Sequence, residues 1–166
     1  QGHVDMEANC HLYDQLIQQG MDGILLLGSI GEFFAISMEE KHRLIREAIA
    51  QINHRVTVYV GTCDMNFEAC VELSNYALAQ GADGAMVISP YYFNLPDSAI
   101  LNFYDTLAQR VEGPLLLYNF PDRTGYDLRP DLVAELALRH ENIIGIKDTV
   151  GAMGHTRGLI QRVKPQ

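Results

Sequence analysis

Short apolar runs alternate with longer amphipathic stretches along the whole chain. The apolar runs follow one another at intervals of about 30 residues, the usual length of one strand and one helix. They are Gly23–Leu27, Val56–Gly61, Ala85–Ser89, Pro114–Phe120 and Ile143–Lys147. Because these runs are apolar almost throughout, they are typical of parallel strands covered by helices. The pattern therefore predicts an α/β protein with a parallel sheet.

The stretches between the runs have helical periodicity. In 37–52 the apolar residues of one face are Leu44, Ile45, Ala48, Ile49 and Ile52. Ser37 followed by Glu40 is a capping box, which predicts where this helix begins.

A faint internal repeat supports the same alternation. The segment LIQQGMDGILLLG around Gly20 recurs as LAQGADGAMVIS around Gly81. In each copy we expect the glycine to take the left-handed turn that ends a helix, before a DG pair leads into a strand.

Alternating strands and helices form either a doubly wound sheet or a (β/α)₈ barrel. Polar and aromatic side chains cluster just after several consecutive strands, which is the habit of a barrel. These clusters are 28–32, 91–92, 118–125 and Lys147. No GxGxxG or Walker-type loop follows a strand, which disfavours the nucleotide-binding alternative.

We therefore expect an α/β fold of the (β/α)₈ TIM barrel type, present as a partial barrel. Residues 1–166 would be a single incomplete barrel domain that carries about strands 2–6 and their helices. One strand before Gln1 and two after Gln166 would be required for closure, and the open sheet edges of such a piece would lower its solubility.

The composition says little about the fold, but it excludes several classes of binding partner. A net charge of −9 argues against nucleic acid or an anionic membrane as a partner. Three cysteines without CxxC spacing, no signal peptide and no membrane-spanning run are typical of a cytoplasmic protein. The six histidines show no HxxxH or HxH spacing, so no metal site is expected.

Lys147 is the first candidate for chemistry, because an ammonium at the end of an apolar strand is costly unless paired or neutral. A neutral, desolvated lysine amine attacks carbonyl carbon. Side-chain alternation predicts that Ile143, Gly145 and Lys147 share a face, with space for a small ligand above Gly145. The alternative is a solvated strand end paired with Asp148.

Tyr118 is the second candidate, on the same face of its strand as Leu116. A phenol beside a Schiff base can shuttle protons. The alternative is a core tyrosine whose hydroxyl is satisfied by backbone.

Three weaker signals come from loops after strands. Gly28 and the Ser29 hydroxyl begin a glycine-containing turn that can hold a carboxylate, although glycines are also ordinary loop residues. Tyr91 and Tyr92 lie on opposite faces of the chain, so one can enter a site while the other packs or meets a neighbouring subunit. Arg123 offers a fork for a second carboxylate, or is simply solvated.

Together the segments GSIGEF (28–33), ADGAMVISPYY (82–92), LYNFPDRTG (117–125) and IIGIKDT (143–149) resemble the dihydrodipicolinate synthase / N-acetylneuraminate lyase family. These are class I, pyruvate-utilising aldolases. The motifs occur in family order through nearly the whole chain, and the combination favours catalysis by Lys147.

The resemblance implies a lyase or synthase that condenses pyruvate with an aldehyde, or cleaves a 2-oxo acid by aldol chemistry. Lys147 would form a covalent imine with pyruvate, so that no separate cofactor is needed. Tyr118 would transfer protons, Tyr92 would reach into a neighbour's active site, and Ser29 with adjacent backbone would bind the carboxylate. A homotetramer is also implied.

Ile30 departs from this pattern, because the family usually has a hydroxyl residue there for a proton relay. Together with GEFF and YNFP, Ile30 favours the branch of 2-keto-3-deoxy sugar-acid aldolases, whereas Arg123 favours the synthases. A third alternative is a non-catalytic barrel fragment.

Overall fold

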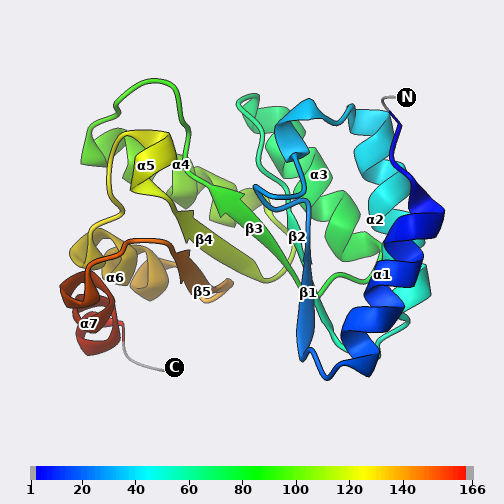
Figure 1. Ribbon diagram of the computed structural model, residues 1–166. Coiled ribbons are helices and arrows are strands. Elements are labelled where there is room, and N and C mark those ends of the chain that lie inside the picture. Colours follow the sequence, from blue (N-terminus) through cyan, green and yellow to red (C-terminus); the bar gives the residue numbers. More distant parts are fainter. Residues whose placement is uncertain (1–2, 164–166) are drawn as a thin grey trace.

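A computed structural model describes residues 3–163, in which strands and helices alternate (Figure 1). The elements in chain order are α1 (Met6–Gln18), β1 (Gly23–Leu26), a 3₁₀ turn (Phe33–Ala35), α2 (Met38–Ile52), β2 (Thr57–Gly61), α3 (Phe67–Ala79), β3 (Gly84–Ile88), α4 (Asp97–Arg110), β4 (Leu115–Asn119), α5 (Pro121–Thr124), α6 (Pro130–Arg139), β5 (Ile143–Asp148) and α7 (Met153–Arg162). All five predicted strands occur, each within one residue or so of the expected bounds.

The five strands form one parallel sheet in the order β1-β2-β3-β4-β5. Strand order equal to chain order is the arrangement of a barrel, whereas a doubly wound sheet reverses direction at a switch point. In Figure 1 the strands follow one another across the molecule, with α1 to α3 beside β1 and β2 and with α6 and α7 beside β5. The structure therefore confirms the barrel topology, and β1 and β5 are the edge strands of the described sheet.

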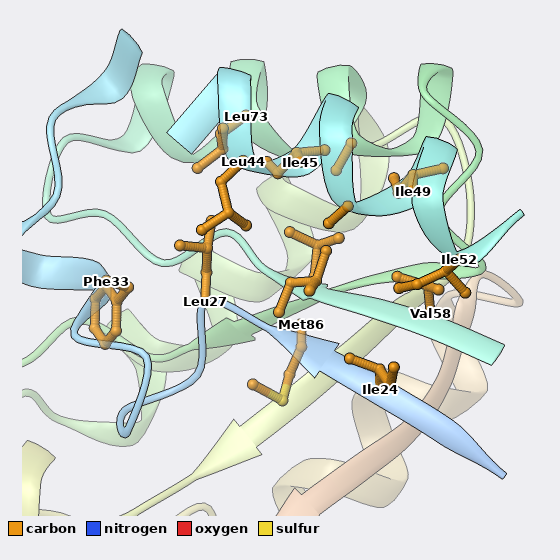
Figure 2. Close-up of a cluster of buried hydrophobic side chains, with 14 of the residues drawn as sticks. Ile24, Leu27, Phe33, Leu44, Ile45, Ile49, Ile52, Val58, Leu73 and Met86 are labelled. Carbon is orange, nitrogen blue, oxygen red and sulfur yellow. The ribbon is translucent and has the colours of Figure 1, made fainter. Parts of the chain in front are cut away.

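Helix α2 shows how local sequence and packing agree. Figure 2 shows its apolar face pointing towards β1 and β2, and every predicted residue of that face is buried (Leu44, Ile45, Ala48, Ile49 and Ile52). Ser37 caps the helix by accepting a hydrogen bond from the Glu40 N–H at 3.3 Å. The Glu40 carboxylate does not complete the capping box and instead accepts the N–H of Val4 at 2.9 Å.

The glycines of the internal repeat adopt the expected conformation. Gly20 has a φ of 87° after α1, and Gly81 has a φ of 103° after α3. Both values lie in the left-handed region that glycine enters without a steric cost.

Strand β5 differs from the prediction in one respect. Ile143 pairs with Leu115, but Gly145 pairs with Leu116, so Ile144 is an extra residue between the two pairs. A bulge of this kind reverses the alternation of side chains beyond it. The prediction that Ile143 shares a face with Lys147 was therefore wrong: Ile143 packs in the outer core beneath the helices.

Substitution of Gly61 tests how closely the end of β2 approaches the backbone that follows β1. A Cβ atom at Gly61 would lie 2.3 Å from the carbonyl oxygen of Leu27, so Gly61→Ala must displace backbone just before the Gly28–Ser29 turn. We expect a loss of about 1–3 kcal/mol in the free energy of unfolding, measured by chemical denaturation. Gly154→Ala in α7 is the control, because its Cβ meets nothing within 4 Å and alanine favours helix. Equal stability of the two variants would contradict this close approach.

Candidate active site

Lys147 and Tyr118 lie side by side at the carboxyl ends of β5 and β4. The two residues are register partners in the parallel ladder, which places their side chains on the same face of the sheet. Lys147 Nζ lies 4.2 Å from the centre of the Tyr118 ring, a cation–π geometry. Tyr118 is buried and Lys147 half-buried, so the amine sits at the border between the core and solvent.

Asp148 does not pair with Lys147, contrary to the alternative that the sequence left open. The Asp148 carboxylate accepts a hydrogen bond from Asn119 at 3.0 Å and contacts His155 at 2.9 Å. Among residues 3–163, no carboxylate oxygen lies within the 4.0 Å of an ion pair with Lys147 Nζ. The amine is therefore not held by a carboxylate of the described chain.

Ser29, in the loop after β1, lies next to Tyr118. Its hydroxyl lies 3.2 Å from the Tyr118 hydroxyl, so the phenol links Ser29 on one side with Lys147 on the other. The loop is the predicted tight turn: the N–H of Glu32 donates to the Ser29 carbonyl at 3.3 Å. A side chain at Gly31 would crowd the backbone of Gly28, at 3.3 Å from its oxygen.

Two predicted site residues lie on the surface near this turn and beyond β3. Ile30 is fully exposed, and its apolar side chain adds no hydroxyl to the Ser29–Tyr118 pair. Tyr92 is 85% exposed at a φ of 83°, and its ring packs on Phe93 rather than on Tyr118. Tyr91 packs inward instead, as expected for side chains on opposite faces of the chain. Contact of Tyr92 with a neighbouring subunit stays a prediction.

Arg123 lies on α5, the short helix that follows β4. Its guanidinium lies 5.6 Å from the centre of the Phe120 ring, and the side chain is exposed. Among residues 3–163 no carboxylate forms an ion pair with it. Its donors are thus available for an anionic ligand, which stays a prediction.

A polar cluster that was not predicted from the sequence lies behind Tyr118 and Lys147. Asn119 follows Tyr118 in β4 and is buried, where it donates to both Asp127 and Asp148. The sequence does contain a hint of this cluster, because Asn119 and Asp148 are polar residues in apolar strands. Each directly follows a candidate residue, Tyr118 or Lys147. Alternation places both on the opposite face from Tyr118 and Lys147.

Cys63 lies just beyond β2, and its thiol is buried. Burial raises the pKa of its thiol to about 11, and its sulfur accepts the N–H of Ile88 at 3.2 Å. A thiol with this pKa is almost wholly protonated near pH 7, and it is therefore a poor nucleophile.

Neither a metal centre nor a membrane span is found in the described part of the chain. Residues 3–163 contain no group of three or more His, Cys, Asp or Glu side chains that can hold a metal ion. None of the described helices is long and apolar enough to cross a membrane.

Comparison with known proteins shows to which family the chain belongs. A model of the "Dihydrodipicolinate synthetase family" matches residues 1–166. The chain belongs to this family. The "Putative 2-dehydro-3-deoxy-D-gluconate aldolase YagE" of Escherichia coli K12 is 42% identical over 98% of the chain and 54% of YagE. The 4-hydroxy-tetrahydrodipicolinate synthase of Methanoculleus marisnigri is 39% identical over 98% of the chain and 55% of that enzyme.

A solved structure of the dihydrodipicolinate synthetase family agrees with the fold. The crystal structure of E. coli YagE in complex with pyruvate superposes with a TM-score of 0.93, covering 97% of the chain and 54% of YagE. The sheet and its surrounding helices thus match part of a family barrel. The chain spans about half the length of the relatives it matches.

Burial of the thiols leads to a prediction about pH and labelling. The pKa of Cys63 is raised to about 11 and that of Cys70 to about 12, both chiefly by burial, so neither thiol ionises near pH 8. We expect a disulfide reagent at pH 8 to label Cys10, which is half-buried, while Cys63 and Cys70 react only slowly. All three should react in 6 M guanidinium, and rapid labelling of Cys63 in the native protein would contradict the packing.

Proposed function

We propose that the protein is a class I aldolase of pyruvate-type 2-oxo acids in which Lys147 forms the imine. The observation that carries the proposal is the contact of Lys147 Nζ with the Tyr118 ring, whose hydroxyl meets Ser29. Membership of the dihydrodipicolinate synthetase family and the pyruvate complex of the YagE relative support it.

The chemistry follows from an amine beside a phenol. The uncharged Lys147 amine attacks C2 of pyruvate to give a carbinolamine, and loss of water leaves a protonated imine. The imine accepts electrons when a proton leaves the methyl carbon, and the resulting enamine attacks an aldehyde to form a carbon–carbon bond. Water then releases the 2-oxo-4-hydroxy acid and the free amine, and the reverse sequence cleaves such an acid. In this proposal Tyr118 moves protons to and from the oxygen atoms of the carbinolamine and of the aldehyde.

The other predicted residues have binding roles in this proposal. Ser29 and the backbone of the Gly28 turn hold the carboxylate next to the keto carbon, and Ile30 borders the acceptor. Arg123, which has exposed guanidinium donors, binds a carboxylate of the second substrate if the protein follows the synthase branch. Tyr92 reaches the site of a neighbouring subunit.

The role of Tyr92 requires a second subunit, and we propose that the protein forms the homotetramer that the family resemblance implies. Exposed apolar side chains at loops after β1 and β3 support subunit contact (Ile30, Phe34, Tyr92 and Phe93). The free thiols of all three cysteines support a reducing, cytoplasmic location. The single sheet of residues 3–163 supports one incomplete barrel domain over 1–166.

Trapping of the imine tests the proposal directly. The chain has only three lysines, Lys41, Lys147 and Lys164, so a reduced pyruvyl adduct is easily mapped by peptide mass. With pyruvate and borohydride we expect modification of Lys147 alone, since Lys41 is buried beside Asp64 at 3.7 Å. Lys147→Arg keeps the charge but should abolish the adduct.

Lys164→Arg is the matched control for the trapping experiment, and it should leave the adduct in place. The absence of any adduct in the folded native protein would refute the proposal, as would an adduct that survives in Lys147→Arg.

A second proposal concerns the branch of the family. Ile30 cannot relay a proton between Tyr92 and Tyr118, and the YagE relative carries the name of a sugar-acid aldolase. We therefore favour cleavage of 2-keto-3-deoxy sugar acids over the synthase reaction.

A comparison of substrates distinguishes the two branches. The native protein should release pyruvate from a 2-keto-3-deoxy sugar acid at least about tenfold faster than it forms 4-hydroxy-tetrahydrodipicolinate, the product named for the synthase relatives, a difference of about 1.4 kcal/mol. Pyruvate release and the condensation product are assayed separately. A gain of synthase activity in Ile30→Thr would identify this position as the source of the preference, and faster condensation by the native protein would contradict the branch.

A further inference from the structure

A buried polar cluster lies directly behind the reactive ends of β4 and β5. Asn119 uses its whole side chain: Nδ2 donates to Asp127 at 2.7 Å and to Asp148 at 3.0 Å, and Oδ1 accepts the N–H of Leu128 at 3.0 Å. A buried amide with every contact satisfied holds its neighbours in one arrangement.

Helix α7 supplies the second half of the cluster. His155 Nδ1 lies 2.9 Å from one Asp148 oxygen, and Nε2 lies 3.1 Å from Asp127. The Thr156 hydroxyl donates to the same Asp148 oxygen at 3.3 Å. The side chains of His155 and Asp148 are only 9% and 10% exposed, so these contacts are shielded from solvent.

Two hydrogen bonds to the Asn119 carbonyl join the carboxyl ends of β4 and β5. Thr149 donates both its N–H, at 3.1 Å, and its hydroxyl, at 2.6 Å, to the Asn119 carbonyl. Tyr118 and Lys147, which directly precede Asn119 and Asp148, are register partners whose side chains lie on the opposite face.

We propose that Asp148, held by Asn119 and His155, is a positioning residue for Lys147. Neighbouring strand residues point to opposite faces, so a fixed Asp148 side chain fixes the direction in which the Lys147 stem leaves β5. This matters because a lysine stem is flexible, and misplacement by about 1 Å costs up to about 100-fold in rate. The inference rests on the proposed imine chemistry of Lys147.

The competing explanation is that His155 merely anchors α7. Two substitutions separate the explanations, because an asparagine amide replaces Nδ1 and a glutamine amide replaces Nε2 of histidine. His155→Asn keeps a donor for Asp148, whereas His155→Gln keeps only the contacts of Nε2, with Asp127 and with the Leu128 carbonyl at 3.2 Å. An anchor that depends on filled volume would tolerate glutamine better, since asparagine leaves the larger cavity.

The measured quantities are the rate of reductive trapping of pyruvate on Lys147, kcat and KM, with thermal unfolding of each variant. We expect His155→Gln to lower the trapping rate and kcat about tenfold with little change in KM, while His155→Asn stays within about threefold of the native protein. The matched control is His140→Asn, which breaks the 2.8 Å contact of His140 Nε2 with Asp105 just before β5 begins. It should leave the trapping rate within about twofold.

Equal slowing by the two His155 variants, or equal slowing by His140→Asn, would overturn the proposal. If His155→Gln does not fold, Thr156→Val removes only the hydroxyl donor to Asp148, and we expect trapping about threefold slower. An unchanged rate in Thr156→Val would then overturn it. Failure of the native protein to form an adduct is a separate outcome, which would refute the proposed function itself.

Discussion

The parallel register between β4 and β5 is the constraint on which the site depends. It sets Lys147 opposite Tyr118, and the carboxyl ends of parallel strands lie at one rim of a barrel. The register includes the bulge at Ile144, without which the same lysine would face the helices. One extra residue thus decides whether the amine lies on the face of Tyr118 or on the face of the outer core.

Tyr118 links the elements that this register brings together. Its ring contacts the Lys147 amine and its hydroxyl contacts the Ser29 hydroxyl, so β4, β5 and the loop after β1 meet at one buried phenol. Asp148, the carboxylate next to Lys147 in the chain, does not pair with the amine, because it contacts Asn119 and His155 instead. Among residues 3–163 no carboxylate therefore pairs with Lys147, while Asp127 and Asp148 gather around Asn119 on the opposite face.

Much of this fold could be read from periodicity, because each strand is a short apolar run and each helix keeps its own amphipathic face. The Ser37 cap and the left-handed Gly20 and Gly81 are local features that short-range sterics and hydrogen bonds decide, and all were predictable. The face of Ile143 was predicted wrongly, because a bulge depends on pairing with the neighbouring strand. The redirection of Glu40 to Val4 was missed for the same reason, since its partner comes from a distant part of the chain.

The sequence by itself determined the strand and helix order, the barrel class and the choice of Lys147, Tyr118 and Ser29 as candidates. Those depend on side-chain chemistry and on periods of two and 3.6 residues, which are properties of the local chain. Only the tertiary structure decided that Ser29 meets Tyr118, that Asp148 turns away from Lys147, and that Asn119, Asp127 and His155 gather behind them. These contacts join residues far apart in sequence, and their geometry exists only once the strands have paired and α7 has packed.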